Sequence, residues 1–270
     1  MTYMQHIAKK SLGQNFLTNT GIVKKACDAA GIVRGEAVLE IGPGKGILTG
    51  ELLSRGAKVV AVEKDRMLFE YLNETFKREV AAGDLTLVEG DILDFDPVLS
   101  SSLKSGYKLV ANIPYNITGA IIEKFLSADV QPKSMTLLVQ KEVAERVVTR
   151  NQKETILSLA VKVYGTPLYV STVKAGSFSP APKVDSAILH IGDISRNAFK
   201  DTEHEKLFFI AVKGGFAHKR KMLLGNLDDI FADKEKLLEM FKKIGLSPKI
   251  RAEDLSLKNW LLLAEMMSSV

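Results

Sequence analysis

Between residues 37 and 140, short apolar runs alternate with longer amphipathic stretches, and this alternation limits the possible folds more than any other feature of the sequence. The stretch MLFEYLNETFKREVAA (67–82), for example, has the apolar spacing of a helix. Strands that alternate with helices form βαβ units, so we expect a parallel sheet with right-handed crossovers. The runs that are typical of its buried strands are AVLEI (37–41), VVAVE (59–63), LTLVEG (85–90), KLVAN (108–112) and MTLLVQ (135–140).

The pattern changes in the last third of the chain. LYVSTVKAG (168–176) and SAILHIG (186–192) are β-like, and they predict a hairpin added at one edge of the sheet. From about residue 196 the spacing of apolar residues is helical. We therefore expect an α/β domain over residues 1–195, followed by a small all-helical domain over residues 196–270.

The composition predicts a cytoplasmic protein with an excess of positive charge. Cys27 is the only cysteine, which fits a reducing compartment, and no apolar stretch approaches the roughly 20 residues that span a bilayer. The N-terminus lacks the apolar core of a secretory signal. Net charge is +5, and residues 1–36, included in the first domain, hold five Lys or Arg against two acids. A basic surface attracts polyanions such as nucleic acid, and a solvated Lys-rich surface is the alternative.

The turn after the first predicted strand is rich in glycine. Gly42, Gly44 and Gly46 in EIGPGKGILT (40–49) let the backbone turn tightly and approach a ligand closely. Glu63 ends the second strand 21 residues after Gly42, where an acid can accept hydrogen bonds from both ribose hydroxyls of a nucleoside. A tight turn and a surface acid are the alternatives. Together the two features favour a nucleoside ligand, and they leave both NAD and S-adenosylmethionine open.

Polar residues also follow the third and fourth predicted strands, at the sheet edge where α/β proteins bind ligands. Asp91 in GDILDFD can reach an adenine amino group or, alternatively, cap a helix. In NIPYNIT (112–118), Asn112 offers an acceptor, and Pro114 directs the backbone carbonyl that precedes it. Tyr115 adds an aromatic face, so the segment suits the exocyclic amine of a flat base. An Asx-type turn with a core tyrosine is the alternative.

The chemistry of an aryl amine fits this segment. Such an amine is a poor nucleophile because its lone pair is delocalised into the ring. Two acceptors on its protons can hold the nitrogen closer to pyramidal and so release the lone pair. The methyl group of a sulfonium is already activated, so the site has to supply alignment and electrostatics. No strong general base is evident in NIPY.

Six short motifs occur along the chain in the order GQNFL (13–17), EIGPGKG (40–46), VEKD (62–65), GDILDFD (90–96), NIPYNIT (112–118) and FSPAPKVDS (178–186). Together they resemble the ribosomal RNA adenine N6-dimethyltransferase family of the kasugamycin-resistance (KsgA) type. The resemblance runs from about residue 9 to residue 265. It implies a Rossmann-like class I methyltransferase sheet, a small helical C-terminal domain, and S-adenosyl-L-methionine as cofactor. NIPY together with GQNFL is highly specific, whereas the glycine loop is shared with many methyltransferases.

The resemblance implies cofactor-binding roles for residues in these motifs. Asn15 and Leu17 would close over the methionine end of the cofactor, and Gly42 would line the same end. Glu63 would hold the ribose, and Asp91 would bind the cofactor adenine.

The resemblance also implies catalytic residues. Asn112 would serve both the cofactor and the target amine. Tyr115 and Phe178 would sandwich the target base, and a core aromatic at the end of a strand is the alternative for Phe178. We expect no metal, because the histidines at positions 6, 190 and 204 form no ligand-spaced cluster.

The methyl acceptors of this family are two adjacent adenines in a hairpin near the 3′ end of small-subunit (16S) ribosomal RNA, and each receives two methyl groups. The implied partner is this RNA or an immature small ribosomal subunit, with a role in subunit biogenesis. Nothing in the sequence requires an oligomer, so we expect a monomer. The predicted RNA-binding residues are Lys9, Lys10, Lys219, Arg220 and Lys221, the last three within GGFAHKRKML (214–223), where a solvated helix start is the alternative.

Other functions remain open from the sequence. Resistance enzymes that methylate large-subunit ribosomal RNA share NIPY, although IGLSPKIRAEDLSLKNWLLL (244–263) resembles the small-subunit enzymes more. The chain can also act mainly as an RNA-binding assembly factor of the ribosome. A nicotinamide-dependent oxidoreductase would share the fold and Glu63, but it would leave NIPYNIT unexplained, and the sequence lacks G-x-G-x-x-G at the glycine loop.

Overall fold

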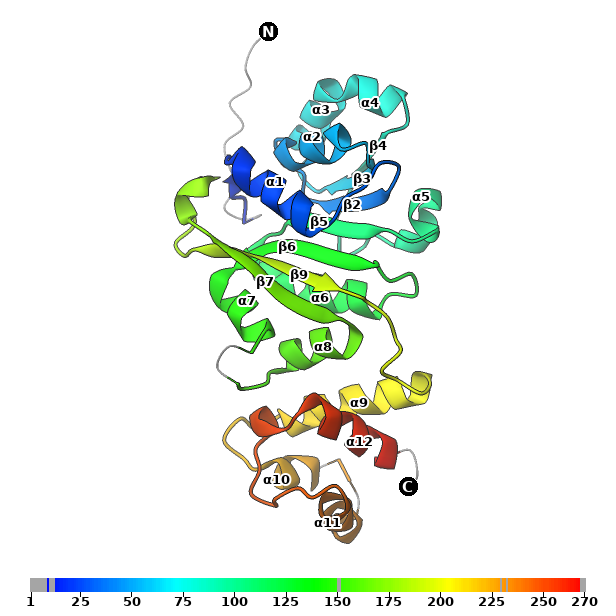
Figure 1. The fold of residues 1–270 in the computed structure, drawn as a ribbon, viewed down its shortest axis with the longest axis vertical. Helices are drawn as coiled ribbons and strands as arrows, with labels where there is room; N and C mark the ends of the chain where they lie inside the picture. Colours follow the sequence, from blue (N-terminus) through cyan, green and yellow to red (C-terminus); the bar gives the residue numbers. More distant parts are fainter. Residues whose placement is uncertain (1–8, 10–12, 150–151, 229, 232, 268–270) are drawn as a thin grey trace. The chain divides into compact units, whose positions relative to one another are not determined.

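A computed structural model shows the chain divided into two compact units (Figure 1). The first unit holds the residues up to Ala144 together with Gly165–Ile194, and the second holds Glu145–Tyr164 together with the residues from Ser195 onward. The structure describes residue 9 and residues 13–149, 152–228, 230–231 and 233–267.

The division of the chain differs from the expectation in one segment. The break after Ile194 lies one residue before the expected boundary. Helix α8 (Ile156–Tyr164), which we expected in the α/β domain, belongs to the second unit. It contacts α12 (Leu257–Met267), and the backbone N–H of Glu154 just before it donates to the carbonyl of Glu253 over 2.8 Å. Apolar spacing predicts which face of a helix is buried, but not which partner buries it.

In the described part of the chain, the first unit contains a seven-stranded sheet. Its strands are β2 (Ala37–Ile41), β3 (Lys58–Glu63), β4 (Leu85–Glu89), β5 (Lys108–Asn112), β6 (Ser134–Gln140), β7 (Thr166–Val173) and β9 (Ser186–Gly192). The order is β4-β3-β2-β5-β6-β9-β7. The strands from β4 to β6 are parallel, as the alternating pattern predicts. β9 is antiparallel to both of its neighbours, which confirms the predicted hairpin of β7 and β9 at the edge.

The helices of this part of the chain follow the predicted rhythm with one departure. They are α1 (Thr20–Ala29), α2 (Ile47–Ser54), α3 (Arg66–Thr75), α4 (Lys77–Ala81), α5 (Ser101–Lys104), α6 (Thr118–Ser127) and α7 (Lys141–Val147). The single helix expected over residues 67–82 is broken into α3 and α4 at Phe76, whose φ and ψ are −110° and 29°. The ring of Phe76 packs so closely on the glycine loop that a Cβ atom on Gly46 would lie 2.5 Å from it.

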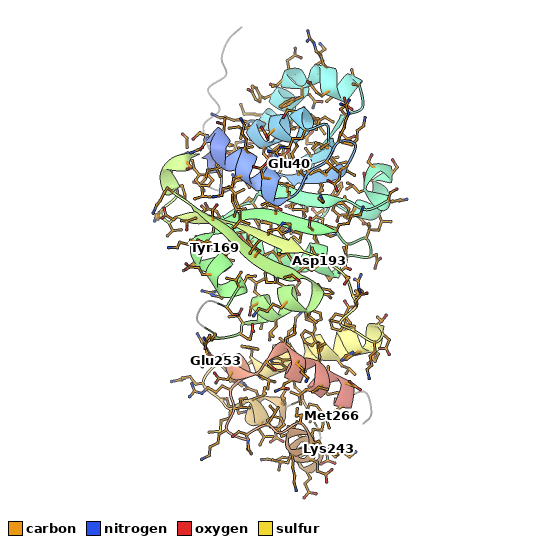
Figure 2. All side chains as sticks on the ribbon, viewed as in Figure 1. Glu40, Tyr169, Asp193, Lys243, Glu253 and Met266 are labelled. Carbon is orange, nitrogen blue, oxygen red and sulfur yellow. The ribbon has the colours of Figure 1, made fainter. Side chains whose placement is uncertain are left out.

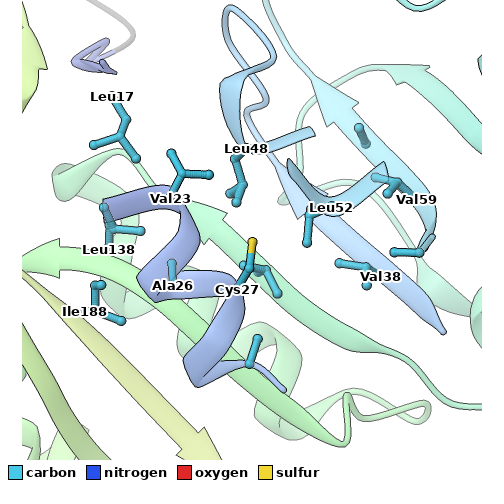
Figure 3. Close-up of a cluster of buried hydrophobic side chains, with 14 of the residues drawn as sticks. Leu17, Val23, Ala26, Cys27, Val38, Leu48, Leu52, Val59, Leu138 and Ile188 are labelled. Atoms are coloured by element: carbon cyan, nitrogen blue, oxygen red, sulfur yellow. The ribbon is translucent and has the colours of Figure 1, made fainter. Parts of the chain in front are cut away.

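One buried cluster packs α1 and α2 against the sheet (Figure 3). Val23 of α1 and Leu52 of α2 belong to the same cluster as the strand residues Val38 and Ile188. Cys27 is fully buried among them, and burial raises the pKa of its thiol to about 12. The thiol therefore stays protonated and acts as a small apolar core residue.

A second, two-stranded sheet joins distant parts of the first unit. β1 (Phe16–Leu17) pairs with β8 (Phe178–Ser179) in an antiparallel register, with Leu17 opposite Phe178. The Thr18 backbone N–H extends this pairing by donating to the Ser177 carbonyl over 2.9 Å. The GQNFL segment is thereby held beside FSPAPKVDS, although most strands of the large sheet lie between these two motifs in the sequence.

The second unit is helical in its described residues. It includes the end of α7 from Glu145 onward, and its other helices are α8, α9 (Thr202–Gly215), α10 (Leu223–Asp228), α11 (Lys234–Lys243) and α12. α9 packs along α12, and the ring of Trp260 lies so close to Gly215 that a Cβ atom there would be 2.4 Å from it. Phe216 stacks on the same indole with 5.9 Å between ring centroids. Among the helices that the structure describes, none combines the length and the apolar character needed to cross a bilayer.

Candidate active site

A pocket opens at the carboxyl ends of β2, β3, β4 and β5, which is the ligand-binding edge of a parallel sheet. Its volume is about 170 Å³, well above the ~10–15 Å³ that one water molecule needs. The predicted site residues that line it are Asn15, Gly42, Glu63, Asp91, Asn112 and Tyr115. The parallel strands thus bring together polar residues that are widely separated in the sequence.

Glycines leave parts of the pocket backbone bare. Gly42 has a φ of +61°, and a Cβ atom built on it would meet no atom within 4 Å. A Cβ atom on Gly90, which also lines the pocket, would likewise project into open space. A ligand can therefore lie directly against the main chain at both strand ends, as a nucleoside site requires.

Glu63 is held firmly at the pocket wall. Its side chain is buried, Oε2 accepts a hydrogen bond from the Gly44 N–H over 3.1 Å, and Oε1 accepts one from the Asp65 N–H over 2.8 Å. Burial raises the pKa of the carboxyl, while backbone N–H donors, including those of Asp65 and Gly44, oppose the rise. Each carboxylate oxygen still has a second acceptor position, so Glu63 can receive two hydroxyl donors without leaving its place.

Asp91 is an ionised acceptor at the end of β4. Lys64 Nζ donates to its Oδ2 over 2.6 Å, and the Leu93 N–H donates to Oδ1 over 2.9 Å. The ammonium group of Lys64 holds the pKa of this carboxyl below its usual range. Asp91 therefore stabilises the turn that follows it, which is not the helix of the capping alternative, and it lines the pocket as well.

Asn112 connects the end of β5 to the N-terminal segment. Its Nδ2 donates to the carbonyl of Asn15 over 3.0 Å. Because the donor end of this amide is engaged, the group that Asn112 offers to a ligand is its Oδ1 acceptor. Ile113 is buried, and Pro114 continues the chain in extended geometry with φ −60° and ψ 132°.

A family model described as ribosomal RNA adenine dimethylase matches residues 5–269. The chain belongs to this family. A ribosomal RNA small subunit methyltransferase A from Dehalococcoides mccartyi is 39% identical over 257 residues, which cover 95% of this chain and 87% of the relative. The protein of the same name from Fusobacterium nucleatum is 38% identical, and the match covers 96% of this chain and 97% of the relative.

Solved structures support the same fold. A dimethyladenosine transferase from Plasmodium falciparum superposes with a TM-score of 0.77 at 27% identity, covering 94% of this chain and 98% of that one. The 23S rRNA methyltransferase ErmE superposes with a TM-score of 0.75 at 24% identity, covering 94% of this chain and all of that one, which shows a shared fold. The expected class I methyltransferase fold is thereby confirmed.

Tyr115 lies in the pocket wall of this dimethylase family member with its ring direction fixed. Its hydroxyl and the Oγ of Ser186, the first residue of β9, are 2.5 Å apart. Burial raises the pKa of the phenol, so the group is neutral. Ser186 is fully buried and pairs in register with both β6 and β7, which makes it a rigid support. The prediction missed Ser186, although it is the last residue of the quoted FSPAPKVDS motif.

Phe178 and Leu17 lie elsewhere. They face each other across the β1–β8 pair, they are only 4% and 5% exposed, and both belong to the core cluster around α1. Phe178 does not line the pocket, so its ring packs as the core alternative describes. Leu17 borders a smaller cavity of about 30 Å³ beside Gly42 and Asn112. The roles given to Phe178 and Leu17 by resemblance stay predictions.

The predicted RNA-binding residues fall in separate places. Lys219, Arg220 and Lys221 are exposed on the segment between α9 and α10 of the second unit. Lys9 is in the first unit, where its Nζ contacts the carboxylate of Asp65. Lys10 lies outside the described residues.

Two buried acids that the prediction did not assign, Asp65 and Glu40, do not line the pocket themselves. Asp65, the last residue of the VEKD motif, is 2% exposed and accepts hydrogen bonds from the N-terminal segment. Glu40 on β2, labelled in Figure 2, is 1% exposed, and no hydrogen bond from the described residues reaches its Oε2. Burial, reinforced by nearby Glu63, raises the pKa of Glu40 to about 8. Within the described residues, no group of three or more His, Cys, Asp or Glu side chains is arranged to hold a metal ion.

Proposed function

We propose that this protein transfers methyl groups from S-adenosylmethionine to N6 of two adjacent adenines near the 3′ end of small-subunit (16S) ribosomal RNA. Each adenine receives two methyl groups. The observation that carries the proposal is that Asn112 and Tyr115 of NIPY line the same pocket as Glu63 and Asp91. Membership of the ribosomal RNA adenine dimethylase family supports the reaction, and the names of the relatives support the small subunit as the target.

The residues of the pocket fit S-adenosylmethionine, the cofactor that this methyltransferase family uses. The open Cβ positions of Gly42 and Gly90 leave room for a ligand against the main chain. We assign the methionine end to Asn15, Leu17 and Gly42. The ribose hydroxyls are assigned to Glu63 and the adenine amino group to Asp91, in keeping with the fixed position of one acid and the ionised state of the other. When bound, the cofactor supplies a methyl group on a sulfonium.

The protein's own contribution to transfer is the alignment of the target amine. Asn112 Oδ1 and the carbonyl of Ile113 accept hydrogen bonds from its two N–H groups, which holds the nitrogen closer to pyramidal and directs its lone pair outward. The stiff turn at Pro114 keeps the second acceptor in place. Tyr115 presents a neutral ring whose direction Ser186 fixes, so the base stacks at a set height. Alignment of this kind is a large source of rate acceleration.

The target adenine has to leave its stack to reach the pocket. Taking a base out of a helix costs a few kcal/mol, and stacking on an aromatic side chain returns about 1–3 kcal/mol. We assign this stacking role to Tyr115, which lines the pocket. Phosphate contacts from exposed cations position the RNA without reading its sequence, and we assign this role to Lys219, Arg220 and Lys221 in the second unit. The immature small subunit is the substrate form that we propose.

The test is methyl transfer from labelled S-adenosylmethionine to unmethylated small ribosomal subunits, with large subunits assayed in parallel. Nuclease digestion and mass analysis identify the modified nucleoside. We expect dimethyladenosine in the small subunit only. Label in the large subunit instead would favour the resistance type of enzyme. No label in either subunit, with the cofactor still bound, would leave an RNA-binding assembly factor as the better function.

A further inference from the structure

Asp65 carries more hydrogen bonds than its place in the fold requires. It is the N-cap of α3, where its Oδ1 accepts the Met67 N–H over 3.1 Å. This bond alone is enough to cap the helix. A carboxylate has about four acceptor positions, however, and Asp65 is 2% exposed, so its remaining positions must be filled by the protein.

The additional partners come from the N-terminal segment. Lys9 Nζ lies 3.0 Å from each carboxylate oxygen, and Gln14 Nε2 donates to Oδ2 over 3.1 Å. Gln14 in turn accepts the backbone N–H of Lys9 on its Oε1 over 2.7 Å. The Lys9 side chain is 46% exposed, whereas the Asp65 side chain is fully buried. The buried acid therefore holds Lys9 and Gln14 through charge-assisted hydrogen bonds.

These contacts meet at the cofactor pocket. On one side, the Asp65 N–H donates to Glu63 Oε1 over 2.8 Å, which helps to fix the proposed ribose acid. On the other side, Gln14 is followed by Asn15, whose carbonyl receives Nδ2 of Asn112 over 3.0 Å. Gln14 and Asn15 both line the pocket, but Asp65 does not. Asp65 thus contacts two residues that line the pocket, Gln14 and Glu63, without lining the pocket itself.

We infer that Asp65 is a positioning residue of the cofactor site, which acts through Gln14 to hold Asn15 over the pocket while its own N–H holds Glu63. This inference rests on the proposed function, because it gives the pocket to S-adenosylmethionine. It follows that loss of the contacts from Lys9 and Gln14 weakens cofactor binding. It also follows that the chemical step is nearly unchanged once the cofactor is saturating, since Asp65 does not touch the reacting atoms.

The test is Asp65→Asn. Asparagine is an equally good N-cap and retains an oxygen that can accept the Met67 N–H. Its second polar atom is an NH₂ group, however, which cannot accept the hydrogen bonds that Lys9 and Gln14 donate to Asp65. We expect the Kd for S-adenosylmethionine, measured by calorimetry, to rise about tenfold or more, as loss of a charged hydrogen bond predicts. We expect kcat at saturating cofactor to stay within about twofold of the wild-type value. The variant should therefore raise the KM for the cofactor and leave kcat nearly unchanged.

The matched control is Asp233→Asn. Asp233 is the N-cap of α11 in the second unit, and it accepts the N–H groups of Glu235 and Lys236. Asp233→Asn makes the same chemical change at a helix N-cap that is distant in sequence from the pocket residues. The Kd for S-adenosylmethionine should therefore equal that of the wild type. A second variant, Lys9→Met, removes one donor from a half-exposed side chain and tests the network without altering the cap.

The pair Lys9→Met and Asp65→Asn forms a double-mutant cycle. We expect Lys9→Met to weaken cofactor binding in the wild-type background and to have almost no effect in Asp65→Asn, because one interaction links the two residues. Unchanged affinity in both single variants overturns the inference and leaves the proposed function intact. A wild-type protein that binds no S-adenosylmethionine overturns the proposed function itself, which is a different and separately visible result.

Discussion

The pocket of the first unit and the basic segment 218–221 of the second unit hold their polar groups in opposite ways. In the pocket, Glu63 receives two backbone N–H groups and Asn112 donates to a backbone carbonyl, so side chains are fixed by the main chain. In the basic segment, by contrast, a side chain fixes the main chain. The buried amide of Asn226 donates to the carbonyls of Gly215 and His218, at 2.5 and 3.2 Å.

The side chains of the basic segment are exposed, in contrast to those of the pocket. The difference matches the two tasks that we assign to these regions. Methyl transfer depends on atoms held within a fraction of an ångström of the reacting geometry, whereas phosphate contacts depend mainly on the number and placement of charges. A change in the pocket should therefore alter the chemical step, and a change in the basic segment should alter RNA affinity and its dependence on salt.

The largest effect is expected from Asn112→Ala. The variant removes the Oδ1 that we propose accepts the target amine, together with the bond to Asn15, while the strand around it keeps its apolar core. Loss of one preorganised polar group at a reacting centre typically lowers kcat by about 10²–10³-fold. Single-turnover transfer to small subunits measures this rate.

The control for Asn112→Ala is Asn73→Ala on α3, whose amide donates to the Phe69 carbonyl outside the pocket. Its turnover should equal that of the wild type. Near-normal turnover in Asn112→Ala, with the protein folded, would exclude the two-acceptor arrangement and with it the contrast between the two regions.

The next effect concerns stability and involves Glu40, a buried acid that does not line the pocket and whose Oε2 receives no hydrogen bond from the described residues. Burial raises the pKa of Glu40 to about 8, so the folded state keeps a proton on Glu40 at pH values where the unfolded chain has lost it. Its contribution to stability is therefore present below the unfolded pKa of about 4.5, and it is lost as the pH rises toward about 8. Between pH 5 and pH 7 the loss is about 2–3 kcal/mol.

Glu40→Gln is neutral at every pH and should flatten this dependence. We expect the free energy of unfolding in urea to fall less steeply from pH 5 to pH 7 in the variant than in the wild type. Glu70→Gln, at an exposed ion pair with Arg66 on α3, is the control and should leave the slope unchanged. Parallel curves for Glu40→Gln and the wild type would mean that Glu40 does not keep a raised pKa.

A smaller effect is expected in the basic segment. Replacing Lys219, Arg220 and Lys221 together by Gln should weaken RNA binding roughly tenfold at moderate salt. It should also reduce the slope of log K against log salt by about 2, since each phosphate contact contributes about 0.7 on single-stranded RNA. kcat at saturating RNA should not change, because the pocket is untouched. Filter binding over a salt series measures both quantities.

The matched control places the same charge change on α11. Lys236, Lys242 and Lys243 are exposed on that helix, and their replacement by Gln removes three charges from the same unit. If both triple variants lose affinity equally, the effect is one of net charge, and the assignment of a specific phosphate-binding segment fails.

Local patterns in the sequence were sufficient to predict the main sheet and its polar edge. Apolar runs and glycine placement depend on neighbouring residues only, so β2 to β6 and the strand ends that carry Glu63, Asp91 and Asn112 could be predicted. The family resemblance then connected these ends into one site.

Contacts between distant segments could not be predicted in this way. β1 and β8 have two residues each, too few to show periodicity, and their pairing sends Phe178 into the core. The partners of Asp65 come from residues about 50 positions earlier, and its motif gave no sign of them. Likewise, α8 has an apolar face that the sequence shows, but its place in the second unit depends on which surface covers it.

The smallest effect is expected at the hydrogen bond between Tyr115 and Ser186, which are 2.5 Å apart at their oxygens. Tyr115→Phe and Ser186→Ala each remove this bond and keep the aromatic face in the pocket. A single neutral hydrogen bond contributes about 0.5–1.5 kcal/mol, so each variant should lose about two- to tenfold in kcat. Since both remove the same interaction, the double variant should lose little more than either one.

Tyr169→Phe is the control, because its hydroxyl makes a comparable 2.7 Å contact with Thr172 on the edge strand β7, outside the pocket. Its kcat should equal that of the wild type. Two results would argue against the positioning role of Ser186. Additive losses in the double variant would show that the two residues act independently. A rise in KM for RNA with an unchanged kcat would mean that Tyr115 helps to dock the RNA and that the fixed direction of its ring does not matter for methyl transfer.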